Sequence, residues 1–280
     1  MKAHIFFPAS KFDFQLLKCG TDKATKLGLN VTCPEPPEPQ WFQCAKPSTR
    51  LQSFLDALHG SAEIIWGARG GFGTAQWLSQ LPHDKNLWKG KRLVGFSDLT
   101  ALHAWTSNRG ISSYHAPMIA TKGWNEASEP ELESWKKAII HQQPQTLPIS
   151  CHGSKQLESG KLIGGNLTVL ASLMGTPHQL QLNPGDILFL EDIQEPPYRL
   201  ARSLFQLSHS QHFEKVQILW GQLTECGSLS VGSLIEKLMA PYLNPWAYGL
   251  DAGHGRPNHS IRLGDQVFIE NSTLSFPAFK

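Results

Sequence analysis

The chain has 280 residues, 40% of them hydrophobic, so it is long enough to bury a core in one large domain or two modest ones. Its 25 basic and 23 acidic side chains nearly cancel, and no segment concentrates lysine or arginine, which argues against a nucleic-acid partner or an anionic-membrane surface. The sequence also lacks a run of about eighteen apolar residues, so we expect no transmembrane helix.

The five cysteines are odd in number and scattered, and no two of them form a Cys-x-x-Cys pair. This usage argues against both a disulfide framework and a zinc site. The N-terminus is apolar over too few residues to be a signal peptide. We therefore expect a protein of the reducing cytoplasm that holds no metal.

The first half of the chain alternates predicted strands and helices: strand 5–7, helix 14–27, a helix capped by Ser48 and ending at Gly60, strand 63–66, helix 75–81, strand 93–94, a helix after Ser97, strand 111–114 and helix 131–140. A loop with five prolines, residues 33–47, separates the first two helices. Such alternation predicts a parallel sheet covered by helices on both faces. We place this α/β domain at residues 1–145 and a polar linker at residues 146–160.

Beyond residue 160 the pattern changes to short apolar runs beside glycines. The predicted elements are a helix at 167–174 and strands at 186–191, 216–219, 248–250, 261–263 and 267–269. This pattern predicts a small β-rich domain with a helix or two at residues 161–280.

Ser97 lies between the predicted strand 93–94 and a segment with helical spacing. A strand-to-helix elbow would hold its hydroxyl out of the sheet and aim the first helix amides at an adjacent oxyanion. The same residues, Ser97 and Asp98, are equally typical of the N-cap of an ordinary helix.

Residues 67–74 hold four glycines between a predicted strand and a predicted helix. Glycines at such a junction let backbone amides approach a ligand closely. The segment matches neither G-x-G-x-x-G nor a phosphate loop that ends in Gly-Lys-Ser/Thr. A tight turn without a ligand remains the alternative.

Glu191 and His254 are two further candidates for chemistry. Glu191 follows an apolar run, so its carboxylate is expected at the edge of the core, where it could orient an imidazole; strand-end acids also simply face solvent. His254 lies between two glycines, which would let its ring face a cleft, although most such histidines are ordinary loop residues. His103 falls on a predicted helix and is expected to be a packing or surface residue.

These candidates would complete one another. A serine needs a base to become nucleophilic, the base needs an acid that fixes its tautomer, and an oxyanion needs donors. Ser97, His254 and Glu191, with the amides of Gly71 and Asp98, would supply all of these functions.

Several segments, in the same order, resemble motifs of the LD-carboxypeptidase family of serine peptidases, also called muramoyltetrapeptide carboxypeptidases. Residues 69–73 resemble RGGYG, residues 95–100 resemble GYSDIT, residues 115–118 resemble HGPM, residues 164–167 and 175–177 match GGNL and GTP, residues 190–199 resemble LEDxxEPPYR, and residues 253–254 match GH. Departures are Ala116 in place of glycine in HGPM, Ala201 where an acid is frequent, and the missing Pro-Gly-Asp opening.

The resemblance implies an N-terminal Rossmann-like domain that carries the nucleophile Ser97 and a C-terminal β-barrel-like domain that supplies Glu191 and the general base His254. It also implies an oxyanion hole formed by the Gly71 and Asp98 amides. The substrate-binding candidates are Arg69, Asn166, Tyr198 and Arg199. Either of these arginines, or Arg202, could bind a free carboxylate by a two-pronged contact.

The implied reaction releases the terminal D-alanine of a murein tetrapeptide by cutting an L,D amide bond in the cytoplasm, during peptidoglycan recycling. The resemblance implies no metal or organic cofactor, a muropeptide as substrate and a homodimer. Three alternatives are a relative of the microcin-immunity hydrolases that cuts an aminoacyl-adenylate mimic, a non-catalytic muropeptide-binding protein, and a Rossmann-type nucleotide enzyme.

Overall fold

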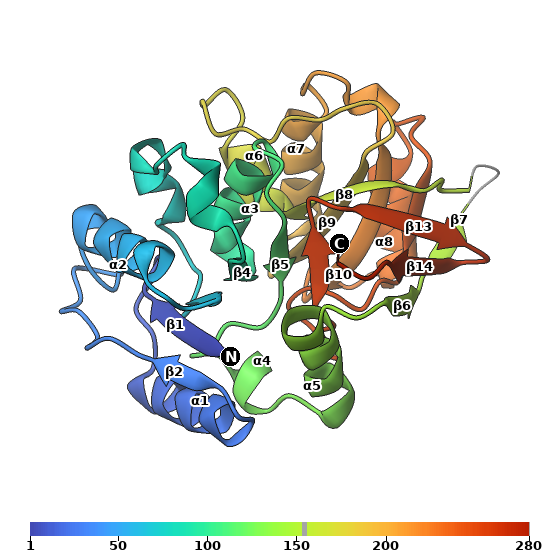
Figure 1. Cartoon of the computed structure of the whole chain (residues 1–280). Helices are drawn as coiled ribbons and strands as arrows, with labels where there is room; N and C mark the ends of the chain where they lie inside the picture. Colours follow the sequence, from blue (N-terminus) through green and yellow to red (C-terminus); the bar gives the residue numbers. More distant parts are fainter. Residues whose placement is uncertain (153–155, 280) are drawn as a thin grey trace.

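The structure is a computed structural model that describes residues 1–152 and 156–279, whose strands form two sheets (Figure 1). The first sheet has the order β12-β5-β4-β3-β1-β2. Its strands are β1 (Lys2–Phe6), β2 (Asn30–Thr32), β3 (Ile64–Gly67), β4 (Arg92–Gly95), β5 (Ser113–His115) and β12 (Ile261–Leu263). All neighbours pair in parallel except β12, which runs antiparallel to β5.

Both faces of this sheet are buried because apolar side chains point to alternate sides of its strands. Phe6, Ile65 and Leu93 face one core, whereas Ile5, Ile64 and Val94 face another. The first core is covered by α2 (Pro47–His59), η1 (Thr74–Gln80), η2 (Lys85–Trp88) and α3 (Thr100–Ser107). The second is covered by α1 (Phe14–Lys26), α4 (Lys122–Asn125), α5 (Glu129–Trp135) and η4 (Lys136–His141).

The second sheet has the order β6-β14-β13-β8-β9-β10-β11-β7 and curls into a half-barrel in Figure 1. Its strands are β6 (Gln145–Pro148), β7 (Ser150–His152), β8 (Gly160–Asn166), β9 (Ile187–Ile193), β10 (Gln217–Thr224), β11 (Trp246–Tyr248), β13 (Gln266–Glu270) and β14 (Thr273–Phe276). The central strands β8 to β11 are parallel, and the outer pairs are antiparallel. The expected combination of a Rossmann-like sheet and a β-rich half is therefore confirmed.

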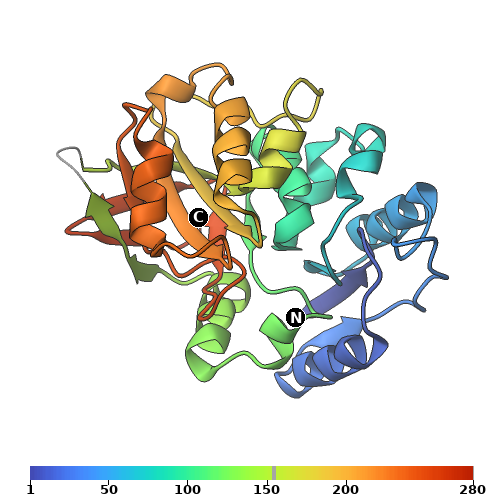
Figure 2. The same ribbon diagram turned by 180° about the vertical axis from the view of Figure 1, so that it is seen from behind.

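The first core continues without a break into the second half of the chain. Leu102 and Trp105 of α3 belong to the same buried cluster as Ile163 of β8 and Leu188 of β9. Helices α6 (Leu167–Ser172), α7 (Pro197–Leu207) and α8 (Val231–Met239) contribute to it as well, and the short turn η5 (Phe213–Lys215) adds Phe213. Figure 2 shows α7 and α8 lying over the second sheet when the molecule is seen from behind.

Several predicted bounds need correction. Helix α2 begins at Pro47 rather than after a Ser48 cap, because proline at the first helical position has the required φ and lacks only an amide that would be unpaired there. The predicted helix 131–140 is α5 followed by a π-helical turn, η4. The strand predicted at 248–250 is β11, which begins and ends two residues earlier.

Helix α7 was not predicted because Glu195-Pro196-Pro197 has the composition of a loop. Pro197 instead occupies the first turn of the helix, where its missing amide does no harm. Leu200, Leu204 and Leu207 then follow at helical spacing and are all buried. In the described residues, no helix is both long and apolar enough to cross a membrane.

Candidate active site

Ser97 lies at a strained elbow between β4 and the turn η3 (Ser97–Leu99) that leads into α3. Its φ is +60°, a left-handed conformation that costs a non-glycine residue energy and persists only where the surroundings enforce it. Leu99 folds back so tightly over the preceding strand that a side chain at Gly95 would collide with it. The elbow exposes Ser97 to a pocket of about 700 Å³.

The glycine-rich loop after β3 lies directly against this serine. A Cβ atom built on Gly70 would stand 3.0 Å from the Ser97 Cβ, 3.1 Å from its Oγ and 3.2 Å from the Asp98 backbone nitrogen. Gly71 follows with a φ of +106° and lines the same pocket. The loop backbone is therefore beside both the Ser97 hydroxyl and the Asp98 amide, as an oxyanion hole requires.

Asp98 fastens the loop to the elbow through its side chain. The Thr74 amide donates a 2.9 Å hydrogen bond to Asp98 Oδ2, and Arg50 Nη1 donates to the Gly73 carbonyl at 2.7 Å. Burial raises the pKa of the Asp98 carboxyl, and the hydrogen bonds from Thr74 oppose that rise. Buried polar contacts thus hold the end of the glycine-rich loop against the elbow.

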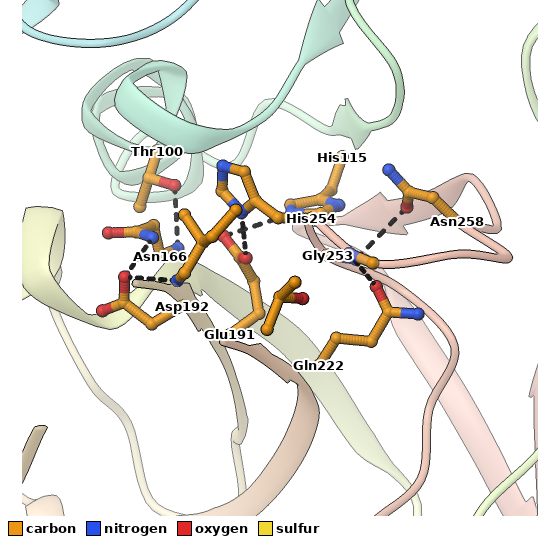
Figure 3. Close-up of polar contacts among 12 residues, drawn as sticks. Thr100, His115, Asn166, Glu191, Asp192, Gln222, Gly253, His254 and Asn258 are labelled. Carbon is orange, nitrogen blue, oxygen red and sulfur yellow. Dashed lines mark hydrogen bonds and ion pairs between the residues drawn. The ribbon is translucent and has the colours of Figure 1, made fainter. Parts of the chain in front are cut away.

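Glu191 and His254 form the second part of the site. His254 Nδ1 lies 2.7 Å from Glu191 Oε2, and the Glu191 side chain is completely buried near the end of β9 (Figure 3). The ring of Phe96, the residue before Ser97, lies 4.6 Å from the His254 ring. Ser97 and His254 line the same pocket.

The electrostatics of this pair favour an ionised acid and a more basic imidazole. Burial alone would raise the pKa of Glu191, but the two imidazoles beside it, first the charge of His254 and then His115, hold it at about 2. Burial likewise lowers the pKa of His254, and the Glu191 carboxylate overcomes that effect and raises it above 6.5. A carboxylate that stays charged next to a ring nitrogen fixes the imidazole tautomer.

The loop that carries His254 is anchored from two sides. Gln222 of β10 accepts a 2.7 Å hydrogen bond from the Gly255 amide, and Asn258 accepts one of 3.2 Å from the Gly253 amide (Figure 3). Glu131 of α5 accepts from the Asn258 amide at 2.9 Å and pairs with Arg256 at 2.6 Å. The general-base candidate is thus held by residues of both halves of the chain.

Cationic side chains line one part of the pocket. Arg69 donates to the Lys11 carbonyl at 2.7 Å, and Lys122 lies exposed at the start of α4. Within residues 1–152 and 156–279, neither has a carboxylate at ion-pair distance, whereas Arg256 is paired with Glu131 and Glu126. Arg69 and Lys122 therefore carry uncompensated positive charge.

Asn166 and Asp192 line another part of the pocket. Asn166 caps α6 and donates a 2.9 Å hydrogen bond to Asp192 Oδ1, and the Thr168 hydroxyl donates to Asp192 Oδ2 at 2.8 Å. Burial, followed by the charge of Glu191, raises the pKa of Asp192. This network fixes the wall of the pocket next to the Glu191 carboxylate.

The structure brings together most of the residues singled out in the sequence. Ser97, Gly71, Arg69, Asn166 and His254 line one pocket. Glu191 contacts His254 Nδ1, and the Asp98 side chain accepts a hydrogen bond from the Thr74 amide beside the elbow.

Tyr198 and Arg199 lie elsewhere, exposed on α7 and outside the pocket lining. His103 is buried, with its ring nitrogens on Ser113 Oγ and the Gly95 carbonyl, so it is a packing residue.

Sequence reasoning missed Lys122, Arg256 and Glu131. Arg256 follows His254 by two residues, and that proximity was an available signal. Lys122 and Glu131 reach the site only through the packing of α4 and α5, which no local pattern reveals. Among the described residues, no group of three or more histidine, cysteine, aspartate or glutamate side chains is placed to hold a metal ion.

A strained serine at an elbow, with a buried carboxylate–imidazole pair in the same pocket, is the arrangement of a serine hydrolase. Residues 4–116 match the LD-carboxypeptidase N-terminal domain, and residues 159–269 match the LD-carboxypeptidase C-terminal domain. The chain belongs to the LD-carboxypeptidase family and is therefore an enzyme of the carboxypeptidase type.

Individual relatives agree with this assignment. The chain is 32% identical to the murein tetrapeptide carboxypeptidase of Pseudomonas aeruginosa, over 80% of this chain and 79% of that protein. It is 24% identical to the microcin C7 self-immunity protein MccF of Escherichia coli, over 79% of this chain and 75% of that protein. The crystal structure of muramoyltetrapeptide carboxypeptidase from Oxalobacter formigenes has the same fold, with a TM-score of 0.86, 24% identity and coverage of 98% of this chain and 97% of that one.

Proposed function

We propose that this protein is a serine-type LD-carboxypeptidase that hydrolyses the amide bond to the terminal D-alanine of murein tetrapeptides. The observation that carries the proposal is the 2.7 Å contact between Glu191 and His254 in a pocket that also holds the strained Ser97. The name of the Pseudomonas relative supports the choice of substrate.

His254 is the general base in this mechanism. Because its Nδ1 donates to Glu191, its Nε2 is the nitrogen left to accept the Ser97 proton. Ser97 Oγ then attacks the scissile carbonyl, and the negative charge that develops on the carbonyl oxygen is stabilised by the Gly71 and Asp98 amides. Protonated His254 gives its proton to the leaving D-alanine nitrogen, and water hydrolyses the acyl-enzyme with the same base.

Arg69 and Lys122 bind the free carboxylate of the substrate in our proposal. They carry the uncompensated positive charge of the pocket, whereas the charge of Arg256 is neutralised by its own acids. A cation that recognises this carboxylate must discriminate a free acid from its amide, since only the acid is charged. This property gives a direct test of the two residues.

The test compares a tetrapeptide that ends in free D-alanine with the same peptide ending in D-alaninamide. We expect the wild-type protein to release D-alanine from the acid and to cut the amide poorly. Arg69→Ala and Lys122→Ala should raise KM for the acid and leave the reaction with the amide unchanged. Arg202→Ala is the matched control, because Arg202 stacks on Tyr198 outside the pocket. Equal use of acid and amide by the wild-type protein would contradict carboxylate recognition.

The second candidate function is hydrolysis of an aminoacyl-adenylate mimic, which the similarity to the microcin self-immunity protein favours. Incubating the protein with a tetrapeptide and, separately, with an aminoacyl-adenylate mimic distinguishes the two. Release of D-alanine alone supports the carboxypeptidase, and cleavage of the nucleoside compound alone supports the alternative.

The cellular setting is also a proposal. We infer a cytoplasmic enzyme of peptidoglycan recycling that acts as a homodimer on muropeptides and has no nucleic-acid partner, on the strength of the family resemblance. Light scattering coupled to gel filtration tests the dimer, and fractionation of cells that produce the tagged protein tests the location.

A further inference from the structure

A second buried histidine contacts the catalytic carboxylate. His115 ends β5, and its side chain is completely buried. Its Nε2 lies 3.8 Å from Glu191 Oε1, while Oε2 of the same carboxylate is taken by His254 (Figure 3). The mechanism proposed above uses His254 and gives no role to His115.

The surroundings of His115 offer its ring no other polar partner. Phe96 and Phe189 pack edge-on against the ring, with centroids at 5.4 Å and 5.1 Å. In the part of the chain that the structure describes, Glu191 Oε1 and both ring nitrogens of His115 have no hydrogen-bond partner. The imidazole and the carboxylate oxygen are thus two buried polar groups that face only each other.

The nearest other titratable groups are accounted for. His103 of α3 lies with its ring 6.4 Å from His115, and both of its nitrogens are already hydrogen-bonded. Burial lowers the pKa of His103 to about 3, so it is neutral. Asp192, on the other side of Glu191, is held by Asn166 and Thr168.

The geometry points to His115 as a positioning residue for the catalytic acid, with its Nε2–H directed at Glu191 Oε1. A buried carboxylate is stable only if its oxygens are matched by donors, and His254 can match one oxygen alone. The separation of 3.8 Å is about 1 Å longer than a hydrogen bond, so a small rotation of either side chain closes it. This inference rests on the proposed function, because it assumes that Glu191 orients His254.

If both imidazoles contact the Glu191 carboxylate, removing His115 should change the pKa of His254. Without His115, the whole negative charge acts on His254, so the pKa of His254 rises and the base remains protonated to higher pH. Once His254 is neutral and holds the carboxylate less tightly, the Glu191 side chain is also free to turn away from Nδ1, which lowers kcat without reversing the direction of the pKa change. Both effects reduce the fraction of enzyme that is ready to deprotonate Ser97.

The first experiment measures kcat and KM against pH for the wild-type protein, His115→Phe and His115→Gln. Phenylalanine keeps a buried ring without a donor, whereas glutamine keeps an N–H donor. We expect His115→Phe to lower kcat by about 10- to 100-fold, as loss of a supporting hydrogen bond does elsewhere, with little change in KM. The acid limb of kcat/KM should move to higher pH, and His115→Gln should recover much of both losses.

His103→Gln is the matched control, because it removes a neighbouring buried imidazole that does not touch Glu191. It should lower Tm and leave the acid limb where it is. A folded His115→Phe protein with an unshifted acid limb, or a His115→Gln protein as impaired as His115→Phe, would overturn the inference.

A second experiment needs no substrate and uses His115→Phe only to assign the His115 signals. Nitrogen-15 NMR of histidine-labelled wild-type protein reports which ring nitrogen of each imidazole carries the proton. The inference requires a proton on His115 Nε2, and a proton on Nδ1 alone would refute it. This readout is independent of the substrate, so an enzyme that fails to cut tetrapeptides but shows the Nε2–H form contradicts only the proposed function.

Discussion

Glu191 Oε2 and His254 Nδ1 lie 2.7 Å apart, although the two residues are 63 positions apart in the chain. Their approach depends on Gly253, which has a φ of +144°. A Cβ atom there would stand 3.2 Å from Glu191 Oε2 and 3.1 Å from the Gln222 Cβ. The small residue before the histidine is therefore what lets its loop pass close enough to β9 and β10 for the pair to form.

Ser97→Ala should abolish most of the turnover. Removal of the nucleophile leaves only roughly a 10³- to 10⁴-fold advantage over the uncatalysed reaction, because binding and the oxyanion hole remain. The measurement is D-alanine release from a tetrapeptide, together with the mass shift produced by a serine-directed fluorophosphonate. Ser61→Ala is the control and should behave as wild type. Ser61 lies before β3, at the end of that strand away from the glycine-rich loop. Near-normal turnover in Ser97→Ala would mean that another residue is the nucleophile.

The rate should rise with pH through a midpoint above 6.5. His254 acts as a base only when neutral, and Glu191 raises its pKa. Glu191 itself, with a pKa of about 2, stays ionised throughout and adds no limb near neutrality. Glu191→Gln should lower kcat by about 10⁴-fold and move the midpoint downward, because burial of His254 is then opposed only by the charge of Asp192. If Glu191→Gln left the midpoint unchanged, the observed pH dependence would not report the ionisation of His254.

Gly70→Ala should impair catalysis with little effect on folding. The added methyl would lie 3.1 Å from the Ser97 Oγ and 3.2 Å from the Asp98 amide, in the space an oxyanion needs. Loss of an oxyanion donor costs about 10²- to 10³-fold in kcat, and we expect a decrease of that size. Gly232→Ala in α8 is the control for the substitution itself. A variant with unchanged kcat would show that the oxyanion binds elsewhere.

Glu131→Ala should destabilise the protein and reduce activity together. The change removes the acceptor of the buried Asn258 amide in the His254 loop, and a buried donor without an acceptor costs about 1–3 kcal/mol. Urea unfolding and kcat/KM are the measurements, and Glu133→Ala on the same helix is the exposed control. Full activity in Glu131→Ala would show that the loop holds its position without α5.

The Glu131 carboxylate also makes the free energy of unfolding depend on pH. Hydrogen bonds from Ser128, Asn258 and Arg256 overcome the effect of burial and lower the pKa of Glu131 from 4.5 to about 2. Its contribution is therefore fully present above pH 4.5 and is lost as the pH falls toward 2. Acid unfolding of Glu131→Gln should show a shallower dependence over that range, and an identical dependence would argue against this role.

Local patterns were sufficient for the parallel sheet, whereas they left the Ser97 elbow open against an ordinary helix N-cap until the family resemblance was considered. The alternation of apolar strands with helices fixes the layers, and a serine after a short strand fits both local structures. Contacts made through tertiary packing could not be predicted in this way. Lys122 reaches the pocket because α4 packs against β3 through Trp124 and Trp66. His115 meets Glu191 although β5 and β9 belong to different sheets. No spacing pattern in the sequence predicts either contact.

The position of β12 constrains when the first sheet can be completed during synthesis of the chain. This strand comes from residues 261–263 and forms the outer strand of the first sheet, beside β5. The proposed division at residues 146–160 therefore separates two parts that share a sheet. A nascent chain released before residue 263 would leave the β5 edge unpaired, and such an edge is a template for aggregation. The serine-bearing half should accordingly acquire its final form only after residues 261–263 have left the ribosome.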